Sequence, residues 1–308
     1  MSTPDTTIVA APIPPLEWPT LLLALALLAG FLALTWFHAT MPWWLFVALG
    51  AVLASWYGSL QHELIHGHPT RRAGLNAALG FAPLALWLPY PRYRDTHLVH
   101  HRDERLTDPI DDPESRYCTP QAWAALGPLG RSIVATQGTL LGRLTLGPAW
   151  AIGGFLLAEL RAVRDGDAAL ARVWLGHALA LAPLLVWIFA VCGVPAWLYL
   201  LAFVQAGTAL SLIRSFAEHR ARPEIAHRTA IVENSRVLGP LFLFNNLHVA
   251  HHRWPHLPWY RLPAAYRAHR DALVAENGGL VYNGYGELFR RFLLRSHDRV
   301  VHPLGRAP

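Results

Sequence analysis

Four long apolar stretches constrain this chain of 308 residues more than any other feature. They run roughly from Trp18 to Phe37, Pro42 to Leu60, Val173 to Val191 and Pro195 to Ile213. Each holds about 19 or 20 residues, which is enough for one helix to cross a hydrocarbon layer of about 30 Å. The links within each pair are very short and contain no arginine. The sequence therefore predicts an all-α integral membrane protein whose four transmembrane helices form two hairpins.

The composition agrees with a membrane protein. The chain is 53% hydrophobic and only 15% charged, whereas soluble domains carry about 25% charged residues. It has a net charge of +6, and its 26 basic residues are all arginine because the sequence contains no lysine. Arginines are frequent in residues 71–172 and after residue 214, so the positive-inside rule places both segments in the cytoplasm. We expect a bacterial inner-membrane protein with a cytoplasmic active site and no nucleic-acid partner.

No repeat or low-complexity linker divides the sequence, so we expect one domain over residues 1–308. Residues 1–17 are predicted to be a flexible tail, and residues 18–60 form the first hairpin. Residues 61–172 form a cytoplasmic and interfacial segment, residues 173–213 the second hairpin, and residues 214–308 a second cytoplasmic segment. The two cysteines, Cys118 and Cys192, lie far apart in dissimilar contexts. They argue against a disulfide framework, a thiolate zinc site or an iron–sulfur cluster.

Three histidine clusters lie next to the apolar stretches or between them. They read His62-Glu-Leu-Ile-His66, His97-Leu-Val-His100-His101 and His248-Val-Ala-His251-His252. On a helix, residues spaced i, i+3 and i+4 lie on one face, so each cluster presents its imidazoles together. Neutral imidazole is the commonest metal ligand, and eight of them exceed what a single zinc ion needs. We therefore predict a polynuclear metal site at the membrane surface.

Two other functions remain open at this point. The first cluster reads HExxH, the signature of zinc metalloproteases, in which two histidines bind zinc and Glu63 acts as a base. A membrane protease of this kind has no use for two further HxxHH clusters, however. A metal-binding or transport protein without catalysis is the second alternative. It fits poorly, because the clustered histidines lie outside the apolar stretches rather than midway through them.

The three clusters, in this order around two hydrophobic hairpins, resemble the histidine boxes of the membrane fatty acid desaturase superfamily and its carotenoid hydroxylase and ketolase relatives. The resemblance covers roughly Trp18 to Pro263. It extends to the acidic segment Asp108-Pro109-Ile-Asp111-Asp112-Pro113, to His219 after the fourth stretch, and to the Asn245-Asn246-Leu247 that precedes the third cluster.

The resemblance implies a non-haem diiron centre on a cytoplasmic helical cap, with O2 as co-substrate. Carried over residue by residue, it implies nine iron ligands: His62, His66, His97, His100, His101, His219, His248, His251 and His252. Imidazole suits iron, but ligand type alone leaves zinc and copper open.

A ligating imidazole usually donates its second N–H to a carboxylate or carbonyl, which fixes the orientation of the ring. Candidates for this supporting role are Glu63, Asp108, Glu218, Asn245 and Asn246, and no catalytic residue beyond the metal ligands is predicted.

The resemblance further implies an O2-dependent oxidoreductase, in the first place a fatty acid desaturase acting on an acyl-lipid or acyl-carrier. A hydroxylase or ketolase of a lipid or carotenoid is the alternative at the same site. The chain has no dinucleotide or flavin motif. Electrons are therefore expected from an external donor such as ferredoxin, rubredoxin or a cytochrome, attracted by the arginine-rich face.

Overall fold

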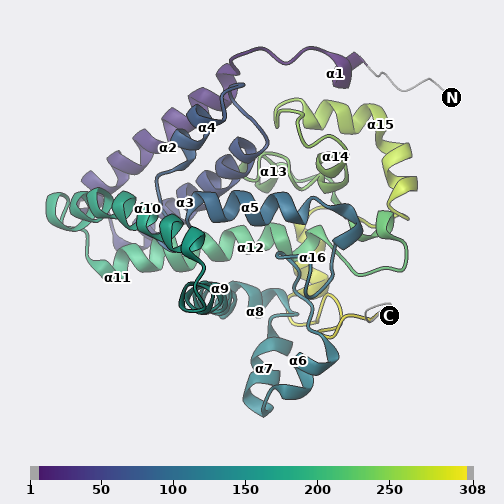
Figure 1. The fold of residues 1–308 in the computed structure, drawn as a ribbon. Coiled ribbons are helices and arrows are strands. Elements are labelled where there is room, and N and C mark those ends of the chain that lie inside the picture. The colour runs from purple at the N-terminus through teal and green to yellow at the C-terminus, as the bar shows by residue number, and fades with distance from the viewer. Residues whose placement is uncertain (1–6, 304–308) are drawn as a thin grey trace. The chain divides into compact units, whose positions relative to one another are not determined.

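The computed structural model describes residues 7–303. The chain folds into two compact units, each built from separate parts of the sequence. Residues 15–95 and 147–212 form the first, which we call the helical-hairpin unit. Of the described residues, 7–14, 96–146 and 213–303 form the second, which we call the histidine unit. Figure 1 shows the order of the elements along the chain.

The long helices are α2 (Trp18–Trp36), α3 (Trp43–Ile65), α5 (Tyr90–His100), α9 (Gly147–Arg164), α10 (Ala168–Leu185), α12 (Gly207–Glu218) and α15 (Leu262–Glu276). Shorter α-helices are α1 (Thr7–Ala10), α4 (Ala73–Gly80), α6 (Pro120–Ala125), α7 (Pro128–Thr136), α8 (Leu140–Thr145), α11 (Ala196–Tyr199), α13 (Leu238–Leu241), α14 (His248–Arg253) and α16 (Tyr285–Phe292). Two π-helical segments are η3 (Val186–Val191) and η4 (Leu200–Ala206). Three 3-10 turns are η1 (His38–Thr40), η2 (Asp103–Arg105) and η5 (Ile225–Arg228), and the strands are β1 (Ile231–Val232) and β2 (Val281–Tyr282).

The four predicted transmembrane helices are confirmed in number and approximate position. Within residues 7–303, four helical segments are long and apolar enough to cross a membrane: Trp18–Trp36, Trp43–Ile65, Ala168–Val191 and Ala196–Glu218. The third joins α10 to η3, and the fourth joins α11, η4 and α12. The second and fourth extend about five residues beyond their expected ends, because the polar residues that follow each apolar run continue the helix rather than break it.

The end of α3 shows why this extension matters for the first histidine cluster. His62 lies inside the helix rather than after it, and His66 is the first residue beyond it. Gly67 then takes a φ of +98°, a left-handed conformation that glycine adopts at little cost, and its N–H bonds to the carbonyl of Leu64. The helix therefore holds His62 and His66 one turn apart.

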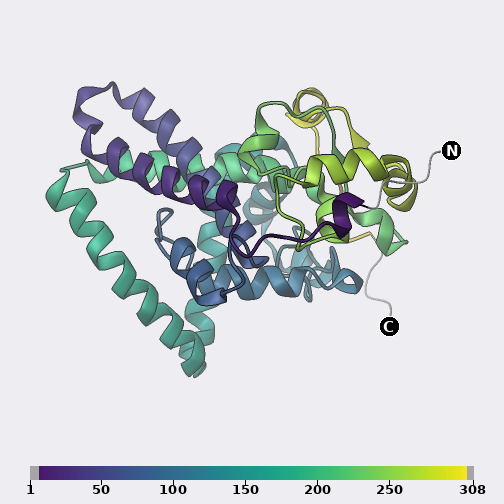
Figure 2. The same cartoon turned by 90° about the horizontal axis from the view of Figure 1, so that it is seen from above.

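The core of the helical-hairpin unit is apolar and partly aromatic. In Figure 2 the two purple helices, α2 and α3, run side by side as an antiparallel hairpin. Phe31 meets the rings of Tyr199 and Phe203 edge-on, with centroids 6.5 and 5.4 Å apart. Tyr199 and Phe203 stack on each other at 4.5 Å.

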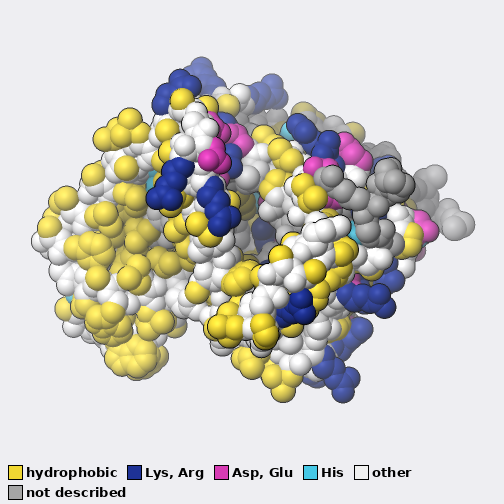
Figure 3. Space-filling view, turned by 60° about the horizontal axis from the view of Figure 1, so that its bottom comes forward, with side chains coloured by type: hydrophobic (Ala, Val, Ile, Leu, Met, Phe, Trp, Pro, Cys, Tyr) yellow, Lys and Arg dark blue, Asp and Glu magenta, His cyan; other side chains and the backbone are white. Residues whose placement is uncertain are grey.

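Large apolar side chains also cover the outside of this unit. On α10, Leu175 and Leu179 are 61% and 68% exposed. Figure 3 shows hydrophobic side chains gathered in yellow over the left of the view, on the side where α10 and α11 lie in Figure 1. Water would disfavour so large a contiguous apolar surface, whereas lipid solvates it.

The histidine unit has a small sheet and a second apolar core. Strands β1 and β2 pair in parallel, with Ile231 opposite Val281. Ile231 packs in a core with residues from α14 and α15. The end of the described chain is held in the same unit, because the N–H of Cys118 bonds to the carbonyl of Val300 and the N–H of His302 bonds to the carbonyl of Cys118.

The predicted flexible tail, residues 1–17, is described only from residue 7. Its last two residues have fixed partners in the helical-hairpin unit. Leu16 forms a bridge with Thr70, and the buried Glu17 donates its backbone N–H to the carbonyl of Pro69. Residues 1–6 lie outside the described part.

Candidate metal centre

Four histidines of the histidine unit point ring nitrogens at one another. They come from the end of α5, the residue after α12, and α14: His100, His219, His248 and His252. The Nε2 of His219 lies 3.0 Å from that of His100 and 3.0 Å from that of His248. The Nε2 of His252 lies 3.2 Å from that of His248. We call these residues the four-histidine group; their ligand atoms all lie within 4.8 Å of one another.

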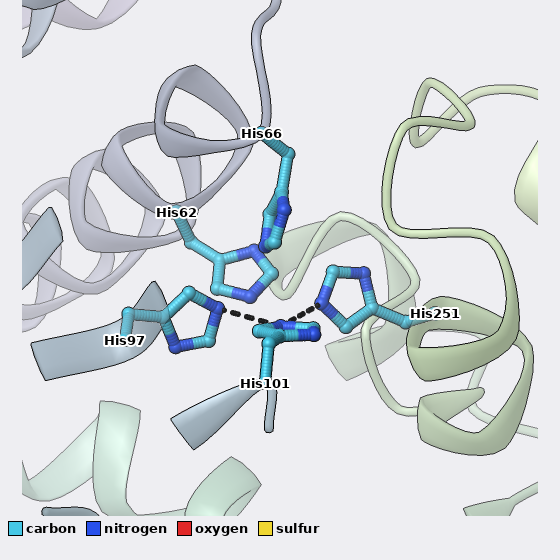
Figure 4. A group of neighbouring side chains, drawn as sticks. All are labelled: His62, His66, His97, His101 and His251. Atoms are coloured by element: carbon cyan, nitrogen blue, oxygen red, sulfur yellow. Dashed lines mark hydrogen bonds between the residues drawn. The ribbon is translucent and has the colours of Figure 1, made fainter. Parts of the chain in front are cut away.

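A second convergence in the same unit joins His97 and His101, at the end of α5, with His251 from α14. The Nε2 of His101 lies 3.0 Å from that of His97 and 3.1 Å from that of His251. Figure 4 shows the three rings with dashed lines along these two contacts. We call these residues the three-histidine group.

Each HxxHH cluster is divided between the two groups. The i,i+4 pair of His97, in the last turn of α5, and His101, the residue after it, belongs to the three-histidine group, while His100 belongs to the other. On α14 the division is reversed: His248 and His252 join the four-histidine group and His251 joins the three-histidine group. Residues three apart on a helix are rotated by about 60° from one another, so one short helix can serve two neighbouring sites. The sequence had suggested a single face for each cluster.

The remaining pair, His62 and His66, lies on α3 of the helical-hairpin unit. Both side chains are buried, and their ring centroids are 4.9 Å apart at 64°. Figure 4 also draws this pair, at the end of its helix. The i,i+4 spacing therefore has the effect predicted for it, which is to bring two imidazoles together.

In three of the converging rings, Nδ1 lies within hydrogen-bond distance of a side-chain oxygen. Carboxylate oxygens lie 2.7 Å from Nδ1 of His97 (Glu114) and 2.9 Å from Nδ1 of His100 (Asp112). The side-chain oxygen of Asn245 lies 3.1 Å from Nδ1 of His248. Each acceptor assigns the proton to Nδ1, which leaves a lone pair on Nε2.

Hydrogen bonds between these rings can satisfy their Nε2 atoms only in part. The single Nε2 of His219 faces those of His100 and His248, and the single Nε2 of His101 faces those of His97 and His251, so one N–H cannot serve both neighbours. The rings of His97 and His100 are each 1% exposed, so water does not replace the missing partner. A shared metal ion removes this conflict. With bonds of about 2.1 Å, two nitrogens 3.0 Å apart subtend about 90° at the metal, an ordinary coordination angle. The donor set of the histidine unit thus fits metal ions bound by imidazole.

The electrostatic setting favours neutral rings at most of these positions. Burial lowers the pKa of His219 and of His248 well below the usual range, and nearby histidines lower both further. Burial also lowers the pKa of His97. At His100 burial acts downward too, but Glu114 and Asp112 outweigh it and raise the pKa to about 9. A metal ion must displace a proton from this ring in order to bind it.

Among the residues predicted to support the ligands, Glu218 and Asn245 lie together beside His248. The Nδ2 of Asn245 donates to Oε1 of Glu218 at 3.2 Å, and the same oxygen lies 3.5 Å from Nδ1 of His248. Arg214 contacts this oxygen too, at 3.2 Å. Asn245, Glu218 and Arg214 therefore form a connected set of side chains beside Nδ1 of His248.

The other three candidates have different surroundings. Asn246 donates to the carbonyl of Val232 at 2.6 Å, which ties the start of α14 to β1. Asp108 accepts the backbone N–H groups of residues 110 and 111 and so shapes a turn. Glu63 lies in the helical-hairpin unit, 3.8 Å from His68.

Sequence reasoning did not select Glu114 and Asp112, the carboxylates that contact ring nitrogens of α5. The available signal was the acidic segment after the second cluster, from which Asp108 was chosen instead. Asp112 is fixed by accepting the N–H groups of Thr107 and Glu114, each at 2.9 Å. Its side chain is therefore held in place before it meets His100.

Arg116 is a second residue that sequence reasoning missed. It donates to the carbonyl of Phe216 at 2.7 Å and to that of His219 at 3.1 Å, so it satisfies backbone acceptors at the end of α12. It also donates to Nδ1 of His297, whose Nε2 lies 2.7 Å from the hydroxyl of Tyr282. Arg116 thereby fixes the backbone of His219, which no longer belongs to the helix.

Comparison with known proteins gives one clear match. The sequence model of the fatty acid desaturase family matches residues 38–286, most of the chain and all three histidine clusters. No curated protein matches significantly. The match agrees with the four membrane-length helices and with the metal-binding histidines of the histidine unit. The chain therefore belongs to the fatty acid desaturase family, as an all-α membrane protein and an oxidoreductase.

Proposed function

We propose that this protein is an O2-dependent, non-haem diiron enzyme that introduces a double bond into the acyl chain of a lipid or acyl-carrier. The observation that carries the proposal is the convergence of seven imidazoles of the histidine unit into two neighbouring groups, four of them buried and three half-buried. Two groups suit two metal ions, and family membership favours iron and a lipid substrate.

We assign nine iron ligands, the seven imidazoles of the two groups together with His62 and His66. The α3 pair is included because it has the i,i+4 spacing of the pairs on α5 and α14, and because both rings are buried. The first cluster is therefore assigned to iron binding rather than to a zinc protease, in which Glu63 would be the base.

Two irons held by these residues would supply the reduction of O2 to water, with two electrons from the substrate and two from an external donor. The protein residues prepare the site for this chemistry. Burial of the rings excludes bulk water, which protects the reaction from side reactions. The acceptors on Nδ1 of His97, His100 and His248 fix these rings, so that their Nε2 lone pairs point inward before any metal binds.

The substrate we propose is lipid-like because the helical-hairpin unit exposes apolar side chains over membrane-length helices. An acyl chain can reach such a protein from the bilayer without crossing water. Hydroxylation or ketolation of a lipid or carotenoid is the alternative product chemistry. It differs from desaturation in whether oxygen is transferred to the carbon from which hydrogen has been removed.

The electron donor we propose is a small acidic protein such as ferredoxin, rubredoxin or a cytochrome, because the chain has a net charge of +6 and its basic residues are all arginine. We place the histidine unit on the cytoplasmic side of a bacterial inner membrane, following the positive-inside rule. Turnover that falls as salt is added, with a ferredoxin as donor, supports the electrostatic part of this proposal. Turnover indifferent to salt and to donor charge contradicts it.

The experiment that tests the function compares membrane lipids of cells expressing the wild-type chain with those expressing His248→Ala. We expect a fatty acid of unchanged chain length with two fewer hydrogens in cells expressing the wild type alone, and only when air is present. A product carrying one 18O atom from 18O2 indicates hydroxylation instead. A lipid and carotenoid profile identical in the two strains, with equal amounts of protein in the membrane, contradicts the proposal.

A further inference from the structure

A third group of metal-ligating side chains lies in the helical-hairpin unit, apart from the imidazole groups. It consists of Glu17, just before α2, Glu63 on α3, and His68, just after α3. One ligand atom from each lies within 4.8 Å of the others. The three residues are between 2% and 6% exposed, so two carboxylates and an imidazole lie together in the interior of the unit.

Only one ring nitrogen of His68 has a hydrogen-bond partner among the described residues. Its Nδ1 lies 2.5 Å from Oε1 of Glu17, a short contact between buried groups. Its Nε2 is equally buried, yet it has no hydrogen-bond partner among residues 7–303. A buried ring nitrogen without a partner is unfavourable, so the arrangement leaves one coordination position of this ring to be filled.

The group that faces this nitrogen is a carboxylate at a distance suited to a shared cation. Oε1 of Glu63 lies 3.8 Å from Nε2 of His68, which is too long for a hydrogen bond. With bonds of about 2.1 Å from each atom, a metal ion placed between them would subtend about 130°. Such a gap is compatible with two ligands of one ion, at an angle wider than the tetrahedral value.

Glu17 is placed like the carboxylate that accepts a hydrogen bond from the non-ligating nitrogen of a metal-bound histidine. By accepting a hydrogen bond from Nδ1–H, Glu17 favours the tautomer in which Nε2 carries the lone pair, and it makes the ring a stronger ligand. Its own position is fixed, since its backbone N–H bonds to the carbonyl of Pro69. Glu17 thus connects the start of the first transmembrane helix to the loop that follows the second.

This group is separate from the ligands proposed for iron. Successive residues on a helix are rotated by about 100°, so Glu63 points away from the face that carries His62 and His66. The two sites therefore use different faces of the same turn of α3.

We propose that His68 and Glu63 bind a divalent transition-metal ion, with Glu17 orienting His68 and water completing the coordination. The mixed nitrogen and oxygen donors suit Fe²⁺, Mn²⁺, Co²⁺ or Zn²⁺ better than Mg²⁺ or Ca²⁺. The ion is additional to those of the imidazole groups, and its binding does not depend on the reaction proposed for them.

The test is a titration of the detergent-purified, metal-free full chain with Co²⁺, which reports its ligands through visible absorption. We expect three ions per chain for the wild type and one ion fewer for His68→Ala. Glu17→Gln keeps the size of the side chain and an oxygen acceptor. We expect this variant to bind the same ion tenfold or more weakly. His177→Ala is the matched control, because His177 is also buried in this unit but its Nε2 contacts the carbonyl of Leu86.

Equal numbers of bound Co²⁺ ions in the wild type and His68→Ala, or equal affinities in the wild type and Glu17→Gln, overturn the proposal. A loss in His177→Ala as large as that in His68→Ala also overturns it, because the loss then reflects general disturbance of the fold. The outcome is distinguishable from failure of the diiron proposal. If the diiron proposal fails, His248→Ala leaves the number of bound ions unchanged, whereas His68→Ala still removes one.

Discussion

The two units of this protein differ in how they use exposed apolar and buried polar side chains. In the helical-hairpin unit, leucines on α10 such as Leu175 and Leu179 face outward, and the hydrogen bonds of the long helices are internal. In the histidine unit, imidazoles, carboxylates and amides are buried, including Asn277 at 0% exposed. The difference fits the first unit to a lipid environment and the second to binding metal through converging imidazoles.

The largest effect is expected from removing a buried imidazole of the histidine unit. His248→Ala deletes a member of the four-histidine group and leaves the lone pairs of its neighbours without their shared ion. We expect iron content and activity to fall together, by more than the 10- to 100-fold typical of changes behind a ligand. Elemental analysis and product formation measure this.

The control for this prediction is His227→Ala, which removes a histidine of the same unit whose side chain is 38% exposed. It should retain both iron and activity. Full activity in His248→Ala would show that this ring is not a ligand.

The next largest effect is expected from placing a charge on the exposed apolar face of α10. Leu179→Asp places a charge near the middle of α10, at a position 68% exposed. A carboxylate in the centre of a membrane helix costs about 2.5–3.5 kcal/mol on insertion, whereas exposed substitutions in water change stability by only about 0.5 kcal/mol. We expect less protein in the membrane fraction, while Leu179→Ala stays near the wild-type amount. Equal insertion of all three proteins would mean that this face does not meet lipid.

A smaller effect is expected from the carboxylate behind His100. Asp112→Asn keeps an oxygen acceptor but removes the negative charge that favours the Nδ1 proton of this ring. We expect iron affinity to fall by about 10- to 100-fold. Glu114→Gln should do less, because the side chain of Glu114 is 29% exposed and water can replace its contact with His97. Competition with a chelator measures both affinities, and a larger loss in Glu114→Gln would reverse this ranking.

The smallest effect is expected at Arg116, which touches only the backbone of a ligand. Arg116→Gln loses charge-assisted hydrogen bonds to the carbonyls of Phe216 and His219, interactions worth about 1.5–3 kcal/mol each. Water can take over part of this role, so we expect about a tenfold loss of activity, with partial recovery in Arg116→Lys. The Mössbauer spectrum of the bound iron should broaden as His219 becomes less well ordered. An unchanged spectrum and rate would indicate that His219 is positioned without Arg116.

Local spacing in the sequence was enough to predict the helices and to select the clustered histidines. Apolar runs of membrane length predicted the four helices, and the spacing of His62 and His66 predicted their proximity. These features depend on a single helix, so periodicity alone reveals them. The ends of the helices were less accurate, because polar residues such as Gln61 and His62 are compatible with both a helix and a loop.

The assembly of the site depends on contacts between distant parts of the chain, which spacing does not encode. Arg116 meets the carbonyl of His219 across 103 residues. The division of each HxxHH cluster between two groups depends on where α5 and α14 present their faces. Asp112 was not distinguished from Asp108, because both lie in one acidic segment and only the turn at residues 107–112 decides which carboxylate reaches His100.

The most direct measurement of the central claim is the metal content of the detergent-purified protein, combined with the Mössbauer spectrum of protein loaded with 57Fe. The proposed ligands predict two irons per chain at the imidazole groups, coupled to each other and both lost in His248→Ala/His101→Ala. If the triad of Glu17, Glu63 and His68 is also filled, its ion remains in this double variant. About one zinc per chain and no iron, with the zinc retained in His68→Ala, would contradict the diiron assignment and direct attention to Glu63 as the base of a protease.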